Sequence, residues 1–189
     1  MTDNITSLSR NGKCEIASYE GLSNFPYLDS VSVKTFSLGI TEGDEPLLKT
    51  WGWDKFIDTQ TCINYFVKAL SKYEKAVADS LKVVVTQYQF DALVSITYNI
   101  GISGEDHSTF LREINSHSSI NNIEQAIMMW DRGGGRVIKG LENRRNNECK
   151  LFANGIYSSG GNVCVIKTNT TNGRVISECD HVINIYGYL

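Results

Sequence analysis

Apolar side chains recur every three or four positions through the middle of the chain, which is the spacing of one helix face. This pattern predicts a helix from about Asp58 to Leu81, on the apolar residues Ile63, Phe66, Val67, Leu70, Tyr73 and Val77. The next helix is expected to begin at Thr86, because Thr86 and Gln89 form a capping-box pattern. It is expected to end at Gly101, a residue suited to a left-handed cap.

Weaker helical patterns flank this central part. A short helix is expected from Ser9 to Tyr19 with Ser9 as its cap, and a last helix from about Gly140 to Phe152. Shorter helices are predicted near Ser108–Ser116 and Asn122–Asp131. The triple glycine at 133–135 has no strand before it and no Gly-Lys-Ser/Thr after it, so it is interpreted as a flexible connector rather than a phosphate-binding loop.

Two segments carry β-strand patterns. Residues Tyr27 to Ile40 include alternating short and β-prone side chains, which predicts a small hairpin or sheet. Near the C-terminus, apolar residues at 163–166 and 175–176 flank Asn172-Gly173, a strong hairpin signal, and residues 182–185 are expected to add a third strand. So short a tail is not stable alone, and it is therefore expected to pack on the helical part.

Length and composition indicate one main globular domain. The chain has 189 residues, of which 41% are hydrophobic and 21% charged. We predict an α+β fold that is mostly helical, with a main domain over residues 1–157 and a β-rich extension over residues 158–189 packed on it.

Charge and hydropathy restrict the partners. The formal net charge of −3 gives no broad attraction to nucleic acid or to an anionic membrane. No apolar run is long enough to span a membrane, and the polar segment Met1–Lys13 lacks the apolar stretch of a signal peptide. Synthesis in a cytoplasm without a signal peptide is therefore expected, with neither nucleic-acid binding nor membrane insertion.

The cysteines are five, odd in number and widely spaced: Cys14, Cys62, Cys149, Cys164 and Cys179. No Cys-x-x-Cys pair or interleaved histidine pattern indicates zinc, so neither a metal nor a cofactor is expected. Free thiols are the default interpretation, and a pair between Cys164 and Cys179 across the C-terminal hairpin is the alternative.

Candidate chemistry lies near the N-terminus, in Glu20, Asp29 and Thr35. Eight residues separate the first pair and five the second. Two carboxylates around a turn and a hydroxyl on the next strand suit hydrolysis of a glycosidic bond, in which one carboxyl protonates the leaving oxygen and the other acts on water or on the developing positive charge. The end of the first predicted helix would place Glu20 where the helix dipole disfavours a charged carboxylate.

The Glu–Asp–Thr spacing resembles that of the phage-type lysozymes, the family-24 glycoside hydrolases. Further blocks carry the resemblance in the same order over roughly residues 12 to 155: Thr86–Ser95, Tyr98–Gly101, Ser108–Leu111, Trp130 and Gly140–Arg145. The resemblance implies a lysozyme-like fold in which the small sheet forms one wall of the active-site cleft. The run Phe36–Thr41 departs from the family pattern, which usually continues with a Gly-Tyr-Gly-His-like run.

By resemblance the protein is a muramidase that cleaves the β-1,4 bond between N-acetylmuramic acid and N-acetylglucosamine and causes bacterial lysis. Glu20 would be the general acid, Asp29 would position or activate water, and Thr35 would orient that water. Asn99 and Arg145 are candidate substrate-binding residues. The alternatives are that Asn99 completes its turn and that Arg145 is structural and pairs with acidic groups or helix ends.

The resemblance also implies peptidoglycan as the partner, a monomeric state, and action on the wall in the periplasm. A holin, a phage particle or a secretion machine would provide delivery. The competing interpretation is a non-catalytic module that binds peptidoglycan or a protein partner on a lysozyme fold. The intact Glu20, Asp29 and Thr35 favour the enzyme, whereas the altered run after Thr35 and the β-prone tail favour the module.

Overall fold

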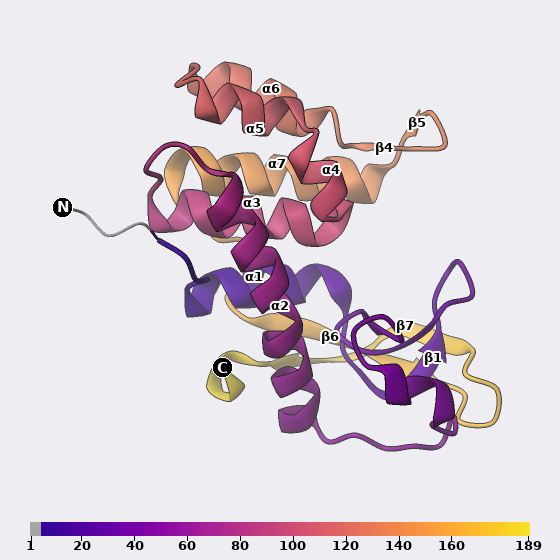
Figure 1. Ribbon diagram of the computed structural model, residues 1–189. Helices are drawn as coiled ribbons and strands as arrows, with labels where there is room; N and C mark the ends of the chain where they lie inside the picture. Colours follow the sequence, from indigo (N-terminus) through magenta and orange to yellow (C-terminus); the bar gives the residue numbers. More distant parts are fainter. Residues whose placement is uncertain (1–4) are drawn as a thin grey trace. The chain divides into compact units, whose positions relative to one another are not determined.

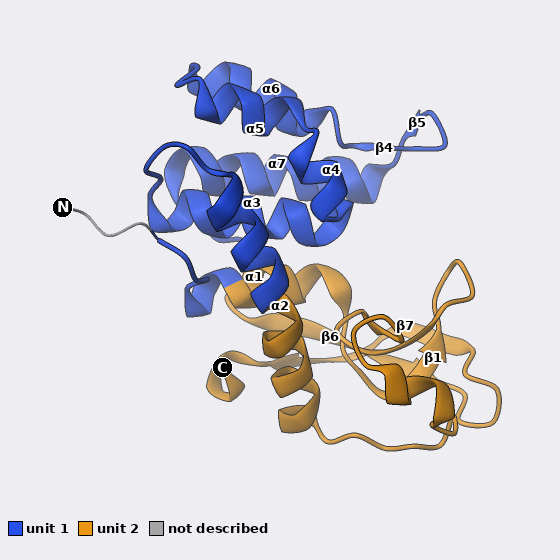
Figure 2. Ribbon diagram, in the orientation of Figure 1, with its two compact units in different colours: residues 1–12, 71–158 blue, residues 13–70, 159–189 orange. Residues whose placement is uncertain are grey.

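The computed structural model describes residues 5–189, so the first residues of the polar segment Met1–Lys13 lie outside it (Figure 1). The chain forms two compact units (Figure 2). Unit 1 comprises residues 1–12 and 71–158, and unit 2 comprises residues 13–70 and 159–189. Helices α1 (Arg10–Glu20) and α2 (Thr59–Ser80) contribute residues to both units. These two helices confirm the predictions for Ser9–Tyr19 and Asp58–Leu81.

Unit 1 is mostly helical. Its remaining helices are α3 (Gln87–Ile100), α4 (Ile102–Asp106), α5 (Thr109–Asn115), α6 (Ile120–Met128) and α7 (Lys139–Asn154). The side chains that they bury include Phe90, Leu93, Phe110, Ile127, Leu151 and Phe152. The predicted helices in this region are confirmed, whereas α4 is an element that the apolar pattern did not predict.

Side-chain caps determine where these helices begin. Thr86 and Gln89 form the predicted capping box of α3, and the hydroxyls of Ser108 and Ser119 accept backbone N–H bonds at the starts of α5 and α6. The end of α3 differs from the prediction, because Gly101 has φ 83° and ψ 157°, outside the left-handed cap region. This backbone conformation is open to glycine, and α4 begins at the next residue.

The triple glycine belongs to a tight hairpin, not to a loose connector. Strands β4 (Arg132–Gly133) and β5 (Arg136–Val137) pair antiparallel. Gly134 and Gly135 between them have φ values of 56° and 79°. Positive φ at both central residues is typical of the two-residue turns that match strand twist. The glycines therefore serve the turn geometry.

Unit 2 holds two small antiparallel sheets. The first has the order β1-β2-β3 and is built from β1 (Ser23–Leu28), β2 (Lys34–Ser37) and β3 (Ile40–Thr41). It confirms the sheet predicted within Tyr27–Ile40 and begins earlier, at Ser23. The second sheet pairs β6 (Asn162–Thr168) with β7 (Val175–Asn184). Short 3₁₀ helices η1 (Pro46–Thr50) and η2 (Tyr186–Tyr188) complete the unit. The α+β class is confirmed.

The C-terminal extension is one two-stranded hairpin. Asn172-Gly173 lies in its connecting loop, as predicted, and Gly173 has φ 72°. The prediction of a third strand over 182–185 is wrong, because residues 182–184 are the end of β7 and Val182 pairs with Cys164 of β6. The polar stretch before Val182 hid this continuity, since β7 is exposed along most of its length and has no apolar alternation there.

A disulfide joins Cys164 to Cys179 within this hairpin, so the alternative interpretation of that pair holds. The remaining cysteines are buried free thiols, as the default interpretation predicted: Cys14, Cys62 and Cys149.

The extension packs on the part of unit 2 that contains the end of α1 and the first sheet. Leu22, between α1 and β1, forms a parallel bridge with Val165 of β6, and Val163 and Val165 are buried. This packing buries Val163 and Val165 of β6, whereas Val175, Ile176 and Val182 of β7 stay exposed. The division into a domain over 1–157 and an extension over 158–189 stays a prediction.

Candidate active site

Glu20 and Asp29 lie at the ends of two neighbouring elements of unit 2. Glu20 is the last residue of α1, and Gly21 follows it with φ 69°, which breaks the helix at that point. Asp29 directly follows β1 and begins the turn into β2. Both carboxylates are half-buried. The helix end predicted for Glu20 is confirmed, and Asp29 lies in the turn rather than on a strand.

The Asp29 carboxylate is held by its own turn. Its Oδ1 accepts hydrogen bonds from the backbone N–H groups of Val31 and Val33, at 2.9 and 2.8 Å. The backbone N–H of Asp29 donates to the carbonyl oxygen of Val33 at 3.0 Å. Its Oδ2 accepts no hydrogen bond from residues 5–189. One oxygen therefore fixes the side chain, and the other is available to a water molecule.

Glu20 and Asp29 line a common open pocket of about 590 Å³. The other lining residues from the N-terminal part are Ser18, Tyr19, Gly21, Tyr27, Leu28 and Ser30. The C-terminal hairpin contributes the remaining wall with Cys164, Ile166, Val175 and Glu178. Every one of these residues belongs to unit 2.

The hydroxyl of Tyr27 lies where the negative charges of both Glu20 and Asp29 act on it. Burial is the main cause that raises the pKa of its hydroxyl to about 12, and the negative charges of Glu20 and Asp29 contribute to this rise. The phenol therefore stays protonated at every pH at which the protein would work, as a neutral hydrogen-bond donor beside two acids. Sequence reasoning gave Tyr27 no role. The available signal was its place two positions before Asp29, which puts both residues on one side of an extended chain.

Thr35 lies on β2, directly opposite Tyr27 of β1 and Thr41 of β3. Its side chain is 3% exposed, and its hydroxyl donates to the carbonyl oxygen of Val33 at 3.1 Å. Directly opposed residues of an antiparallel pair have Cβ atoms about 5 Å apart, so Thr35 is a close neighbour of Tyr27. Thr35 does not itself line the pocket of Glu20 and Asp29.

Arg145 is part of a buried ionic cluster on α7. Its side chain is 0% exposed and pairs with Glu148, which also pairs with Arg144 at 3.1 Å. Ser95 of α3 donates its hydroxyl to Glu148 at 2.7 Å, and Arg144 donates to the Ser95 carbonyl oxygen at 3.1 Å. A fully buried guanidinium cannot contact a glycan, so the expected substrate-binding role of Arg145 is corrected to the structural alternative. Asn99 is exposed near the end of α3, and its role stays a prediction.

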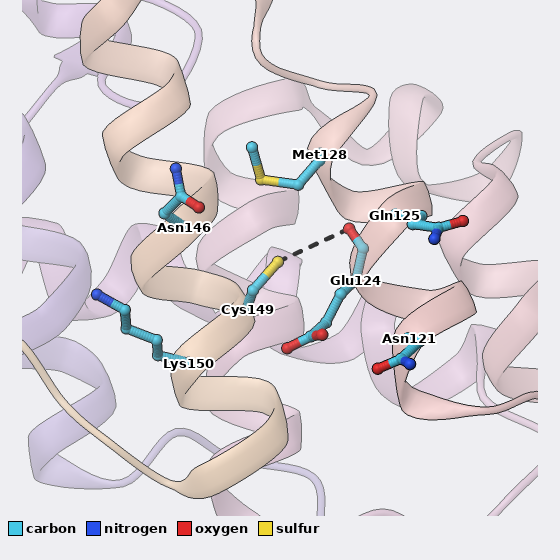
Figure 3. Close-up of a pocket in the computed structure, with 7 residues that line it drawn as sticks. All are labelled: Asn121, Glu124, Gln125, Met128, Asn146, Cys149 and Lys150. Carbon is cyan, nitrogen blue, oxygen red and sulfur yellow. Dashed lines mark hydrogen bonds between the residues drawn. The ribbon is translucent and has the colours of Figure 1, made fainter.

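A second pocket lies in unit 1, between α6 and α7 (Figure 3). Its lining residues are Asn121, Glu124, Gln125, Met128, Asn146, Cys149 and Lys150. The Cys149 thiol donates to the carbonyl oxygen of Glu124 at 3.8 Å. Burial raises the pKa of this thiol to about 12, with Glu124 and Glu148 adding to the effect, so Cys149 is not an activated nucleophile. This pocket carries no catalytic arrangement of the kind built around Glu20.

Residues 5–189 contain no group of three or more His, Cys, Asp or Glu side chains placed to hold a metal ion. Among the same residues, no helix combines the length and the hydropathy required of a membrane span.

The α+β fold and this pair of carboxylates define a lysozyme-like protein, and comparisons with known proteins identify the family. Residues 17–148 match the model of the phage lysozyme family, so the chain belongs to that family. The SAR-endolysin of Enterobacteria phage P21 is 33% identical over 132 residues, which cover 70% of this chain and 76% of that protein.

The endolysin of Bacillus phage B103 is 29% identical over 184 residues, covering 95% of this chain and 66% of that protein. The endolysin of Bacillus phage PZA matches over 29% of its length, so the chain spans less than two thirds of both Bacillus phage relatives.

Solved structures agree on the fold. The endolysin from Escherichia coli O157:H7 phage FAHEc1 superposes with a TM-score of 0.71 at 30% identity, covering 80% of this chain and 96% of that one. The muramidase domain of SpmX from Asticaccaulis excentricus gives a TM-score of 0.68 at 27% identity, covering 78% and 97%. The predicted lysozyme-like fold is confirmed.

Proposed function

We propose that this protein is a peptidoglycan hydrolase of the muramidase type, which cleaves the β-1,4 bond between N-acetylmuramic acid and N-acetylglucosamine and so lyses bacterial cells. The observation that carries the proposal is the shared pocket of Glu20 and Asp29, in which Tyr27 is neutral beside both acids. Glycoside hydrolysis requires two such carboxyl groups on opposite sides of the scissile bond. Family membership supports the same reaction.

In the proposed mechanism Glu20 donates its proton to the leaving glycosidic oxygen as the bond to the anomeric carbon breaks. Asp29, fixed through Oδ1, uses Oδ2 to orient a water molecule and to take its proton as the water oxygen adds to the anomeric carbon. Thr35, which does not line the pocket and whose hydroxyl donates to the Val33 carbonyl oxygen, would orient this water once its hydroxyl turns away from that carbonyl. A substrate-binding role of Asn99 stays a prediction.

The proposed site of action is the bacterial wall, on its periplasmic side, and the proposed working form is a monomer. Relatives named endolysin and SAR-endolysin support action in phage lysis. Release through a holin, or delivery by a particle or secretion machine, stays a prediction. So does the competing function of a non-catalytic binding module.

The test is Glu20→Gln, which preserves the shape of the side chain and removes its acidic proton. We expect lysis of outer-membrane-permeabilised Gram-negative cells, and release of new reducing ends from purified sacculi, to fall by about a hundredfold or more. Glu42→Gln is the matched control, since Glu42 is exposed in the same unit and does not line the pocket. Sacculus binding without turnover by the unmodified protein would instead support the binding module.

A further inference from the structure

The C-terminal hairpin forms one wall of the candidate catalytic pocket. Ile166 of β6 and Val175 and Glu178 of β7 line it together with Glu20 and Asp29. The family match ends at residue 148, before either strand begins. The hairpin is therefore a part of the site that the family match does not cover.

Backbone hydrogen bonds attach this wall beside both carboxylates. The N–H of Leu22, two residues after Glu20, donates to the carbonyl oxygen of Cys164 at 2.8 Å. The N–H of Ile166 donates back to the Leu22 carbonyl oxygen at 2.7 Å. At the other end of the hairpin, the N–H of Leu28, the residue before Asp29, donates to the Gly173 carbonyl oxygen at 2.8 Å. The position of the wall relative to the two acids is thus fixed.

Ile166 packs directly against the chain that carries Glu20. A Cβ atom built on Gly21 would lie 3.1 Å from Cδ1 of Ile166, which leaves no spare space between them. Ile166 is only half-buried, and Val175 is 37% exposed, so both present apolar surface to the pocket. Such a surface suits the apolar face of a sugar ring.

Glu178 adds a third carboxylate to the pocket. It is exposed and forms no hydrogen bond or ion pair with residues 5–189, whereas Asp180, on the same strand, is paired with Lys167 and His181. No lysine, arginine or histidine is among the residues that line the pocket. An ionised carboxylate only accepts hydrogen bonds, so Glu178 selects N–H and O–H donors and favours a positively charged one.

We propose that Glu178 is a substrate-binding residue which makes the site prefer glycan chains with free amino groups, that is, partly de-N-acetylated amino sugars. This inference rests on the proposed muramidase function and deepens it. An ammonium group donates a charge-assisted hydrogen bond to Glu178 in a pocket that also holds Asp29, whereas the N–H of an acetamide donates a bond from a neutral group. The hairpin thereby contributes specificity as well as packing.

The experiment compares two substrates made from one batch of sacculi, one fully N-acetylated with acetic anhydride and one enzymatically de-N-acetylated in part. Release of reducing ends gives kcat and KM for the unmodified protein and for Glu178→Gln. We expect the unmodified protein to prefer the de-N-acetylated substrate. Glu178→Gln should raise KM on that substrate by about tenfold, with a smaller change in kcat and little change on the acetylated substrate.

Asp180→Asn is the matched control, because it removes an exposed charge from the same strand without touching the pocket. It should behave as the unmodified protein does. Equal kinetics of Glu178→Gln and the unmodified protein on both substrates would overturn the proposal, as would an equal loss in Asp180→Asn. Melting temperatures of all variants should agree, since Glu178 is exposed.

A failure of the proposed function gives a different result. In that case the unmodified protein would release no reducing ends from either substrate. Cosedimentation with the two kinds of sacculi then decides the inference by itself: weaker binding of Glu178→Gln to the de-N-acetylated sacculi supports it, and unchanged binding refutes it.

Discussion

Glu148→Gln removes the negative charge that the two buried guanidinium groups of Arg144 and Arg145 share. Both side chains are almost fully buried, at 6% and 0% exposure, and Glu148 itself is 0% exposed. Removing one member of a buried ionic cluster leaves uncompensated charge in a medium of low polarity and typically costs about 3–5 kcal/mol. Because small domains unfold with about 5–15 kcal/mol, this change would remove about a fifth or more of the stability.

Urea denaturation measures this loss. With a denaturant slope of about 2 kcal/mol per molar, the midpoint should fall by about 2 M. Glu142→Gln is the matched control on the same helix, since its pair with Lys139 is exposed, at 79% for the lysine and 34% for the glutamate. That pair should contribute about 0–1 kcal/mol. Equal midpoints for the two variants would refute the structural role of the cluster and reopen a surface role for Arg145.

Further predictions concern the proposed water, the hairpin turn and the thiols. Asp29→Asn and Thr35→Val should lower the rate of sacculus hydrolysis non-additively, because both act on one water, and strictly additive losses in the double variant would exclude this. Gly173→Ala should lower the melting temperature much more than Gly160→Ala does. Both glycines have positive φ, but a Cβ atom on Gly173 would lie 2.4 Å from the Trp53 ring, whereas a Cβ atom on Gly160 would have no atom within 4 Å. The buried free cysteines should resist iodoacetamide at pH 8 in the native protein, because burial raises the pKa of two of these thiols to about 12, and fast labelling before unfolding would contradict their burial.

Local signals in the sequence were sufficient to predict most elements. The capping box of Thr86 and Gln89 and the Ser9 cap act within one helical turn, so neighbouring residues alone reveal them. The Ser9 hydroxyl accepts the N–H of Gly12 at 2.9 Å, as an N-cap should. The position of Glu20 followed from the same kind of evidence, because a helix capped at Ser9 and broken at Gly21 must end there.

Contacts between distant parts of the chain could not be predicted in this way. No residue near Glu178 indicates that its partners in a pocket are Glu20 and Asp29, because the contact arises from backbone pairing of β6 with Leu22. The burial of Arg145 likewise depends on how α7 packs in three dimensions. The sequence left open pairing with acidic groups or a place at the saccharide cleft, and the structure identifies Glu148 as the partner.

The bridge between Leu22 and Val165 also has a consequence for biosynthesis. The first helix and the first sheet leave the ribosome well before the strand that pairs with Leu22 is synthesised. At roughly 5–20 residues per second, the early segments wait on the order of ten seconds for their partner. The proposed saccharide pocket can therefore be completed only after β6 and β7 have been synthesised. A chain that stops before β6 would contain Glu20 and Asp29 but would lack the hairpin that forms the other wall of their pocket and is hydrogen-bonded beside them.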